Sequence, residues 1–397
     1  MRICVGGKNN IAVDVCHYLL EHFSSDVISV IPTKGDDGKD GFQRSLRKYA
    51  KERDIQIVSL EKIYEWDDLI FLSTEFDRII RPEEFKSKEL FNIHFSLLPQ
   101  YKGCHTAAMP ILNGEEMTGV TLHLMDNGID TGDIVEQRKL LIEPNDTCRS
   151  LYLKLIALGT KTVIDNIDRI IAKDYMAYSQ PYDNSTYYAR TDIDYANIRI
   201  DYNRTAKQID RQIRAFSFRD FQMPCYGGKP ILYTEITNDK SVDKPGTLIY
   251  EDDYFFRLAT IDYDILLYKD RLAEVISLVQ DGKIEELKRI KNLRRYVVEH
   301  EPTHGWTLLM IAAYHCQYKV VEYLTSLGSN INAINNHGTT VIMFAKNGYL
   351  EHQNDSVIRY LLKKGANPYQ RDYAGLSLYD YTDKLDKRIT EKIKNLI

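Results

Sequence analysis

An asparagine and a histidine lie two residues apart in the apolar segment Phe91–Phe95, which reads FNIHF. Because side chains alternate between the two faces of a strand, Asn92 and His94 are expected on one face and Ile93 on the other. The segment SLLPQYKG that follows ends the strand and opens into a loop that contains glycine. At the carboxyl end of a strand in an α/β sheet, polar side chains face the crevice where ligands bind. The pair therefore predicts a ligand-binding or catalytic site.

A second polar patch follows in the segment GVTLHLMDNGIDTGDIV, residues 119–135. It reads as a strand over Val120–Met125 that runs into a glycine-rich turn carrying Asp126, Asp130 and Asp133. Turns rich in Asp, Asn and Gly are common in proteins of every kind, so this patch gains meaning only together with the first.

Asn92, His94 and Asp130 together have the composition of an acyl-transfer site. An amide can donate to a developing oxyanion, an imidazole can move a proton near neutral pH, and a carboxylate can orient the imidazole. Neither Ser96 nor Cys104 lies in a sequence signature of covalent catalysis. Direct attack by a substrate amine is therefore the simplest reaction for this set.

The elements that must position these residues alternate between strands and helices. Apolar runs predict strands at residues 2–5, 27–31, 55–60, 69–73, 91–95 and 119–125, with helices near residues 11–23 and 43–53. This order predicts an α/β, Rossmann-like fold with a doubly wound, mostly parallel sheet. A long helix capped by Asp146 or Thr147 and ending near Lys173 is expected to close a catalytic domain of residues 1–175.

The remainder of the chain predicts two further domains. A short helix at residues 206–216 and four β-rich pieces between turn-forming segments indicate a small, mixed, β-rich middle domain over residues 176–270. Residues 271–397 repeat with a period near 33, marked by Gly305, Gly338 and Gly375. This period, with an Ala-containing first helix and a second helix ending in LLKKGAN, resembles the ankyrin repeat, in about two full copies with degenerate caps.

Composition limits the class of partner. The formal net charge is −5 and no long run of Lys or Arg occurs, which argues against a nucleic acid. The six cysteines show no paired spacing, so neither a zinc site nor a disulfide framework is expected, and no metal is predicted. With no signal-like or membrane-spanning apolar run, the chain is expected in the cytoplasm, without a membrane partner.

The segment NIHFSLLPQYKG, followed by NGEEMTGVTLHLMDNGIDTGDIV, resembles the folate-dependent formyltransferases, which share N-x-H, S-L-L-P, T-G-V-T and D-T-G-D. The resemblance implies that Asn92, His94 and Asp130 occupy the catalytic positions and that 10-formyltetrahydrofolate donates the formyl group. It also implies that the pterin lies against the segment STEFDRIIRPEEF, with the loop before Asp130 on its other side. The folate-binding residues implied in this way are Arg78, Ile79, Ile80 and Asp126.

Within this family, the segments MRICVGGKNNIAVDVCHYLL, FRDFQMPCYGGKPI and NSTYYAR look like the branch that formylates nucleotide-linked amino sugars. The appended repeats are similar to those of dTDP-3-amino-3,6-dideoxyhexose N-formyltransferases. This likeness implies a role in surface polysaccharide (O-antigen of lipopolysaccharide) biosynthesis and a homodimer formed through the middle domain. The alternatives are formylation of a 4-amino sugar nucleotide or of methionyl-tRNA, and an ankyrin scaffold attached to an inactive formyltransferase domain.

Residues for the acceptor are predicted from residue type and position. Amides and an ammonium at the end of the first strand can meet a sugar or its diphosphate, and aromatic side chains with nearby arginines can hold thymine and phosphate. The alternatives are an ordinary turn for the first group, and a core or dimer contact for the aromatic side chains. The expected acceptor-binding residues are Lys8, Asn9, Asn10, Lys102, His105, Tyr188, Arg190, Phe218, Arg219, Phe221 and Tyr226.

A second ligand site is predicted in the repeats. Trp306, one of only two tryptophans, lies next to Gly305 at the hairpin end of a repeat, with Tyr314 and His315 close in sequence. Two repeats offer little area for a stable protein interface, so a small ligand such as a second nucleotide sugar is expected there, with a protein as the other partner class. A partly buried cap residue is the alternative for Trp306.

Overall fold

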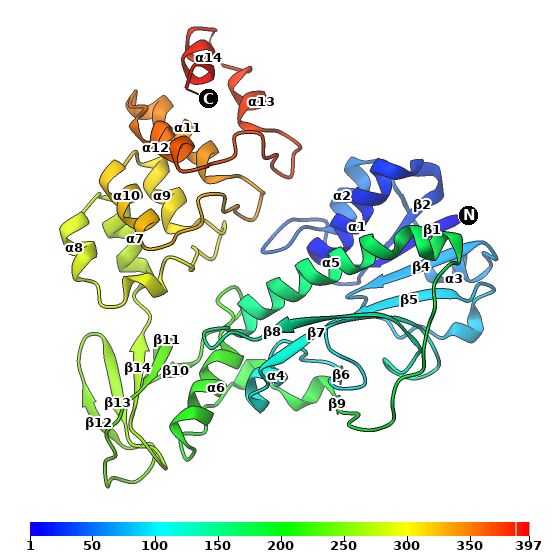
Figure 1. The fold of residues 1–397 in the computed structure, drawn as a ribbon, viewed down its shortest axis with the longest axis horizontal. Coiled ribbons are helices and arrows are strands. Elements are labelled where there is room, and N and C mark those ends of the chain that lie inside the picture. Colours follow the sequence, from blue (N-terminus) through cyan, green and yellow to red (C-terminus); the bar gives the residue numbers. More distant parts are fainter. Residues whose placement is uncertain (386, 397) are drawn as a thin grey trace. The chain divides into compact units, whose positions relative to one another are not determined.

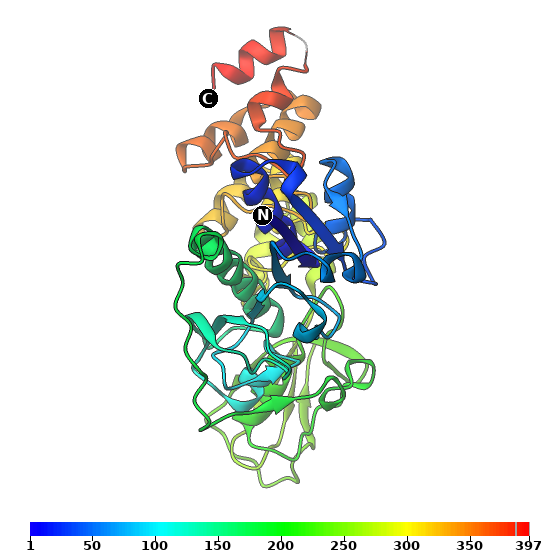
Figure 2. The ribbon, with the colours of Figure 1, turned by 90° about the vertical axis from the view of Figure 1, so that its right-hand side faces the viewer.

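The computed structural model describes residues 1–385 and 387–396, which form two compact units. The first consists of Met1–Lys39 and Gln43–Lys269, and the second of Asp40–Phe42 and Asp270–Ile397. The border between the two units, after Lys269, lies one residue before the boundary predicted after residue 270. The boundary predicted at residue 175 lies inside the first unit, which contains a seven-stranded sheet, a five-stranded sheet and a two-stranded pair (Figures 1 and 2).

A seven-stranded sheet forms the centre of the first unit, in the order β3-β2-β1-β4-β5-β7-β8. The first five strands in this order are parallel, and β7 and β8 are antiparallel to their neighbours. The predicted mostly parallel α/β sheet is therefore confirmed. The strands are β1 (Arg2–Gly7), β2 (Ile28–Pro32), β3 (Gln56–Ile57), β4 (Leu69–Thr74), β5 (Glu89–His94), β7 (Met117–Leu124) and β8 (Ile134–Leu141).

The strand predicted at residues 55–60 is wrong in its second half. Only Gln56–Ile57 pair in the sheet as β3, and Leu60 begins α3 (Leu60–Tyr64), where Leu60 and Ile63 are both buried. Apolar residues three apart fit one face of a helix as well as they fit a short strand, so the run alone did not separate the two.

Helices α1 (Asn9–His22), α2 (Leu46–Glu52) and α5 (Cys148–Ala172) pack on one another and on the sheet. Thr147 caps α5, because its hydroxyl accepts from the backbone of Ser150 while the Ser150 hydroxyl accepts from the backbone of Thr147. This reciprocal pair is a capping box. A Cβ at Gly159 of α5 would lie 2.9 Å from the Phe95 ring, so the helix can approach the end of β5 closely only with glycine there.

The β-rich part of the first unit is a separate antiparallel sheet of order β10-β11-β14-β13-β12, covered by α6 (Ala206–Phe216). Ile209 and Ile213 of the helix are buried against Ile231 and Leu267 of the sheet. Strands β6 (Lys102–Gly103) and β9 (Tyr187–Tyr188) form a small parallel pair of their own, and α4 (Met109–Asn113) packs on α6. The strands of the five-stranded antiparallel sheet are β10 (Cys225–Tyr226), β11 (Lys229–Ile236), β12 (Leu248–Glu251), β13 (Phe255–Leu258) and β14 (Ile265–Lys269).

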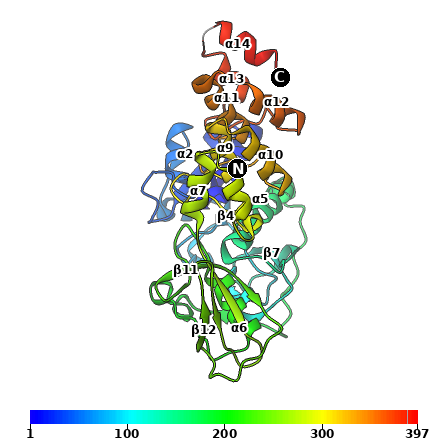
Figure 3. The ribbon, with the colours of Figure 1, turned by 90° about the vertical axis from the view of Figure 1, so that its left-hand side faces the viewer.

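The second unit is a succession of short helices, which Figure 3 shows as a stack. Gly305, Gly338 and Gly375 have φ angles of 74°, 76° and 78°, a left-handed conformation that glycine adopts without a steric penalty. The conformation repeats once per helix pair, which explains the regular spacing of these glycines. The helices are α7 (Leu272–Gln280), α8 (Ile284–Arg289), α9 (Leu308–Tyr314), α10 (Tyr318–Ser326), α11 (Val341–His352), α12 (Ser356–Lys363), α13 (Leu378–Thr382) and α14 (Lys387–Lys394).

Among residues 1–385 and 387–396, no helix combines the length and apolar character needed to cross a membrane.

Candidate active site

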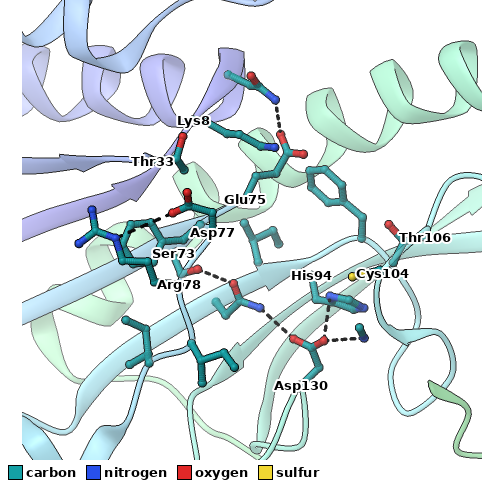
Figure 4. A pocket seen from close by; sticks show the side chains of 18 of the residues that line it. Lys8, Thr33, Ser73, Glu75, Asp77, Arg78, His94, Cys104, Thr106 and Asp130 are labelled. Atoms are coloured by element: carbon teal, nitrogen blue, oxygen red, sulfur yellow. Dashed lines mark hydrogen bonds and ion pairs between the residues drawn. The ribbon is translucent and has the colours of Figure 1, made fainter. Parts of the chain in front are cut away.

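A pocket of about 1100 Å³ lies at the carboxyl ends of β1, β4 and β5 (Figure 4). Ligands of doubly wound sheets bind at this edge, because the loops that follow parallel strands all meet there. Asn92, His94 and Asp130 all line the pocket. The three predicted catalytic residues are thus brought together by the fold.

Asp130 contacts both predicted partners and one backbone amide. Its Oδ2 lies 3.4 Å from His94 Nδ1 and accepts a hydrogen bond from the backbone N–H of Gly103 at 2.8 Å. Its Oδ1 accepts from Asn92 Nδ2 at 3.3 Å. Asn92 and His94 therefore point to the same face of β5, as their spacing predicted.

His94 is almost fully buried and is positioned to take up a proton. Its Nε2 lies 2.8 Å from the backbone carbonyl of Tyr101, which can only accept, so Nε2 carries a proton. Burial lowers the pKa of His94, and the nearby Asp130 charge offsets this shift only in part. The ring is therefore neutral at neutral pH and has its lone pair on Nδ1, the atom that faces Asp130.

Asp130 remains ionised beside this neutral ring. Burial acts to raise the pKa of Asp130, but His94, His123 and the Gly103 amide together hold it well below its usual range. An ionised carboxylate 3.4 Å from Nδ1 favours a proton on that nitrogen. The pair is thus arranged so that a proton arriving at Nδ1 is stabilised at once.

The Asn92 amide is fixed by two side chains that the sequence analysis did not assign. Ser73 Oγ donates to Asn92 Oδ1 at 2.7 Å, and Asn92 Nδ2 lies 3.1 Å from His123 Nε2. His123 Nδ1 donates to the Leu124 carbonyl at 2.7 Å, so its Nε2 has the lone pair and accepts from Asn92. Ser73, Asn92 and His123 are cross-strand partners on β4, β5 and β7, a row that only the register of the sheet reveals.

Replacing His123 with phenylalanine should lower kcat because the Asn92 amide loses one of its two acceptors and is held less firmly. We expect a fall of roughly 10-fold, the size of one to two hydrogen bonds, with little change in the KM for the formyl donor. His123→Gln, whose side-chain oxygen can accept from Asn92, should recover part of the rate. An equal loss in both variants would indicate a packing role for His123. Steady-state kinetics of the purified variants makes the comparison.

Backbone strain is concentrated around the pocket. Asn9, Glu75, His105 and Asp130 line it, and their φ angles are 66°, 56°, 63° and 53°. Residues other than glycine rarely adopt this left-handed region, and such conformations persist where the surrounding structure requires them. The strain marks the segments after β1, β4, β6 and β7 as parts of a functional site.

The predicted folate residues Arg78, Ile79, Ile80 and Asp126 also line the pocket. Ile79 is 79% exposed, and Ile129, in the turn between β7 and β8, is 45% exposed. Arg78 Nε is buried without a hydrogen-bond partner and lies 4.0 Å from Asp77 Oδ1. Asp126 accepts from the backbone of Gly128 and from the Thr131 hydroxyl, so it shapes its own turn.

Of the predicted acceptor residues, Lys8, Asn9, His105 and Arg190 line the pocket. His105 Nε2 donates to the Arg190 carbonyl at 3.1 Å, which ties together two segments far apart in the sequence.

The other predicted acceptor residues lie outside the lining of this pocket. Asn10 accepts from Arg44, and Tyr188 accepts from Asn113 and stacks on Tyr101. Lys102 lies in β6, paired with β9. The remaining residues outside the lining are Phe218, Arg219, Phe221 and Tyr226.

The aromatic residues of that last group have packing contacts or are exposed. Tyr226 packs on Phe256 in the core of the antiparallel sheet, at 4.9 Å between ring centroids. Phe218 is buried against Tyr152, and Phe221 is 72% exposed. The alternative of a core contact is therefore the one that fits Phe218 and Tyr226.

In the second unit, Trp306 belongs to an aromatic cluster. Its ring lies 4.8 Å from Phe344 and 5.9 Å from Tyr314, and the His315 ring lies 5.2 Å from Tyr314. Trp306 is half-buried. The three residues predicted for a second ligand are thus neighbours, and their role remains a prediction.

In the part of the chain that the structure describes, no group of three or more His, Cys, Asp or Glu side chains is arranged to hold a metal ion.

Comparison with known proteins agrees with this geometry. Residues 27–167 match the family model described as formyl transferase, and residues 192–274 match the formyl transferase C-terminal domain. Residues 278–372 match ankyrin repeats in three copies, so the predicted repeat is confirmed and one further copy is recognised.

Two crystal structures are similar over most of their length. WlaRD, a sugar 3N-formyl transferase crystallised in the presence of dTDP and 5-N-formyl-THF, is 42% identical with a TM-score of 0.64, covering 68% of this chain and 98% of that one. An N-formyltransferase from Helicobacter canadensis, in complex with folinic acid and dTDP-3-aminofucose, is also 42% identical, with a TM-score of 0.64 and coverage of 68% and 100%. The methionyl-tRNA formyltransferase of Ehrlichia canis is 32% identical over 272 residues, 63% of this chain and 86% of that protein.

Proposed function

Because the chain belongs to the formyl transferase family, we propose that it formylates the amine of a dTDP-linked 3-amino-3,6-dideoxyhexose, with 10-formyltetrahydrofolate as the donor. The observation that carries the proposal is the neutral, buried His94 with its Nδ1 beside the ionised Asp130 in a pocket of about 1100 Å³. The named relatives at 42% identity support the choice of acceptor.

The proposed chemistry uses His94 and Asp130 to move one proton. The acceptor amine must be neutral to attack a carbonyl carbon, and it becomes positively charged as the new C–N bond forms. Nδ1 of His94 takes a proton from that nitrogen, and the resulting imidazolium is held between the Asp130 carboxylate and the Tyr101 carbonyl. With Asp130 ionised beside it, the imidazolium then returns this proton to N10 of the donor as the formyl C–N10 bond breaks and tetrahydrofolate leaves.

Asn92 is proposed to stabilise the negative charge that develops on the formyl oxygen. Asn92 lines the pocket and its Nδ2 donates to Asp130 and His123, and during the reaction one of these hydrogen bonds is replaced by one to the formyl oxygen. An amide fixed from its other side by Ser73 is a preorganised donor, which lowers the cost of reorienting it during reaction.

The donor side of the pocket fits a flat, partly apolar ligand. Ile79, after β4, and Ile129, after β7, both line the pocket with exposed apolar side chains, which suits an aromatic ring system. The buried Nε of Arg78, which has no hydrogen-bond partner, leaves one donor available in the same wall. Bound 10-formyltetrahydrofolate would supply the formyl carbon, and these residues with Ile80 and Asp126 would hold it.

Charge favours a sugar nucleotide over methionyl-tRNA as the acceptor. Proteins that bind nucleic acids neutralise many phosphates with Lys and Arg, whereas this chain has a formal net charge of −5. Lys8 and Arg190 line the pocket, which is enough positive charge for one diphosphate. The finer assignments that rest on family likeness are a role in surface polysaccharide (O-antigen) biosynthesis and a homodimer.

An acceptor panel tests the proposal. The purified protein is incubated with 10-formyltetrahydrofolate and, in turn, dTDP-3-amino, dTDP-4-amino and UDP-4-amino sugars and methionyl-tRNA, and products are identified by mass spectrometry. We expect formylation of the dTDP-3-amino sugar with a kcat/KM at least 100-fold above the others, since a misplaced amine lies outside attack distance of the formyl carbon. Preferential formylation of methionyl-tRNA, or no product with any acceptor, would refute it.

A further inference from the structure

Glu75 occupies an unusual place in the pocket, and the proposed mechanism does not use it. It follows the last residue of β4 and stands one position beyond the Thr74–Ile93 pair, as His94 does on β5. Because neighbouring strands run about 4.8 Å apart, the backbone of Glu75 lies beside that of His94. Both side chains line the pocket. Figure 4 shows Glu75 and Lys8 at one end of the pocket and Asp130 at the other.

The side chain of Glu75 turns toward α1 and α5. Its Oε2 accepts from Tyr152 Oη at 2.9 Å and from Asn9 Nδ2 at 3.1 Å. Tyr152 packs against Phe95, which lies on the opposite face of β5 from His94. Glu75 and His94 thus approach the pocket from opposite sides of the end of the sheet.

The protein satisfies only part of the hydrogen-bonding capacity of this carboxylate. A carboxylate can accept about four hydrogens, while Tyr152 and Asn9 supply one each. The Tyr152 ring packs against the rings of Phe95 and Phe218, with centroid distances of 6.3 and 5.6 Å. This packing fixes the Tyr152 hydroxyl, which holds Glu75 in one orientation. A rigid carboxylate with open acceptor positions therefore faces the pocket.

This arrangement is costly for the protein, which argues against a purely structural role. Desolvation raises the pKa of Glu75, only partly offset by the nearby Lys8 charge, and its φ of 56° is strained. Tyr152 and Asn9 already hydrogen-bond directly to each other at 2.7 Å, so a carboxylate is not needed to join α1 to α5. Strained and perturbed groups that line a pocket are candidates for ligand recognition.

The chemistry of Glu75 selects the part of the acceptor that it meets. A carboxylate repels a diphosphate but accepts strongly from a hydroxyl group. The amine itself must lie beside His94, on the other side of the sheet end, so Glu75 is placed for a substituent next to the amine. Building on the proposed function, we infer that Glu75 accepts a hydrogen bond from a ring hydroxyl adjacent to the reacting amine and so determines which amino sugar is formylated.

The test compares acceptors that differ by one hydroxyl. Wild-type and Glu75→Gln proteins are assayed with the dTDP-3-amino-3,6-dideoxyhexose and with its 2-deoxy and 4-deoxy analogues. For the full acceptor, Glu75→Gln should lower kcat/KM roughly 10- to 100-fold, as expected for a lost hydrogen bond to a charged group. For the analogue that lacks the recognised hydroxyl, the two proteins should differ by less than about threefold. Binding of dTDP and of 5-formyltetrahydrofolate should be unchanged.

Two further variants keep the outcome decisive. Glu21→Gln changes an exposed glutamate of α1 and should leave all rates at wild-type values. Tyr152→Phe removes the donor that orients Glu75 and should lower the preference for the full acceptor about threefold. This variant tests the inference if the Glu75→Gln protein is insoluble. Equal losses on all three acceptors, or none, would overturn the inference. A wild type that formylates none of them would instead refute the proposed function.

Discussion

Replacement of His94 with alanine is expected to lower kcat by roughly 10²- to 10⁴-fold, the usual contribution of a positioned acid–base group. The reason is that His94, which burial keeps neutral, contacts Asp130 directly through Nδ1. His123 also approaches Asp130, at 3.6 Å, but its Nε2 is occupied by Asn92. Single-turnover formyl transfer with saturating donor and acceptor measures the effect on the chemical step.

The control for this variant is His22→Ala, which alters an exposed histidine at the end of α1. It should keep the wild-type rate. Donor binding to the His94→Ala protein, followed by tryptophan or ligand fluorescence, should stay within about threefold of wild type if only proton transfer is lost. A His94→Ala protein that folds and retains more than a tenth of the wild-type kcat would contradict the mechanism.

Substitution of Asp130 with asparagine is expected to have an effect of similar size and an additional signature in the pH profile. The amide cannot stabilise an imidazolium, so kcat should fall roughly 10²- to 10⁴-fold. Asp130 raises the pKa of His94 against the effect of burial. Removing its charge lowers that pKa further, so the imidazolium forms only at lower pH. The acid limb of kcat that belongs to His94 should therefore move to lower pH in the variant.

The direction of this shift separates an electrostatic role from a structural one. If Asp130 only held the loop in place, Asp130→Asn would lower kcat without moving the acid limb of the pH profile. A shift of that limb to higher pH would contradict the electrostatic role of Asp130. The matched control is Asp133→Asn in the same loop, since Asp133 has no contact with His94 among the described residues. Rates are compared between pH 5 and pH 9 with saturating ligands.

The three proposed catalytic residues could be picked out from the sequence because the patterns that mark them are local. Asn92 and His94 need only the two-residue period of a strand, and Asp130 follows from a strand that ends in a glycine-rich turn. Ser73 and His123 could not be predicted in this way, since they reach Asn92 through strand register, which depends on pairing between segments 19 and 31 residues away. Register is set by the packing of the whole sheet rather than by neighbouring residues.

The acceptor residues show a second limit of the sequence. An aromatic side chain has the same pattern whether it stacks on a base or fills a core, and Phe218 and Tyr226 proved to be packed against other rings. Glu75 was missed for the opposite reason, because an acidic residue in STEFD looks like part of an exposed turn. Its burial depends on Tyr152 of α5, which lies 77 residues further along the chain.

The Gly103 amide, which donates a hydrogen bond to Asp130, links acceptor selectivity to turnover. Gly103 pairs with Tyr188 in β9, and a Cβ at this position would lie 2.4 Å from the Tyr188 carbonyl oxygen. A side chain there would displace the segment that carries Arg190. It would also disturb the hydrogen bond from the Gly103 amide that helps to keep the pKa of Asp130 low. Libraries intended to broaden acceptor choice should therefore vary residues 104–106 and leave Gly103 fixed, because at Gly103 selectivity and turnover change together.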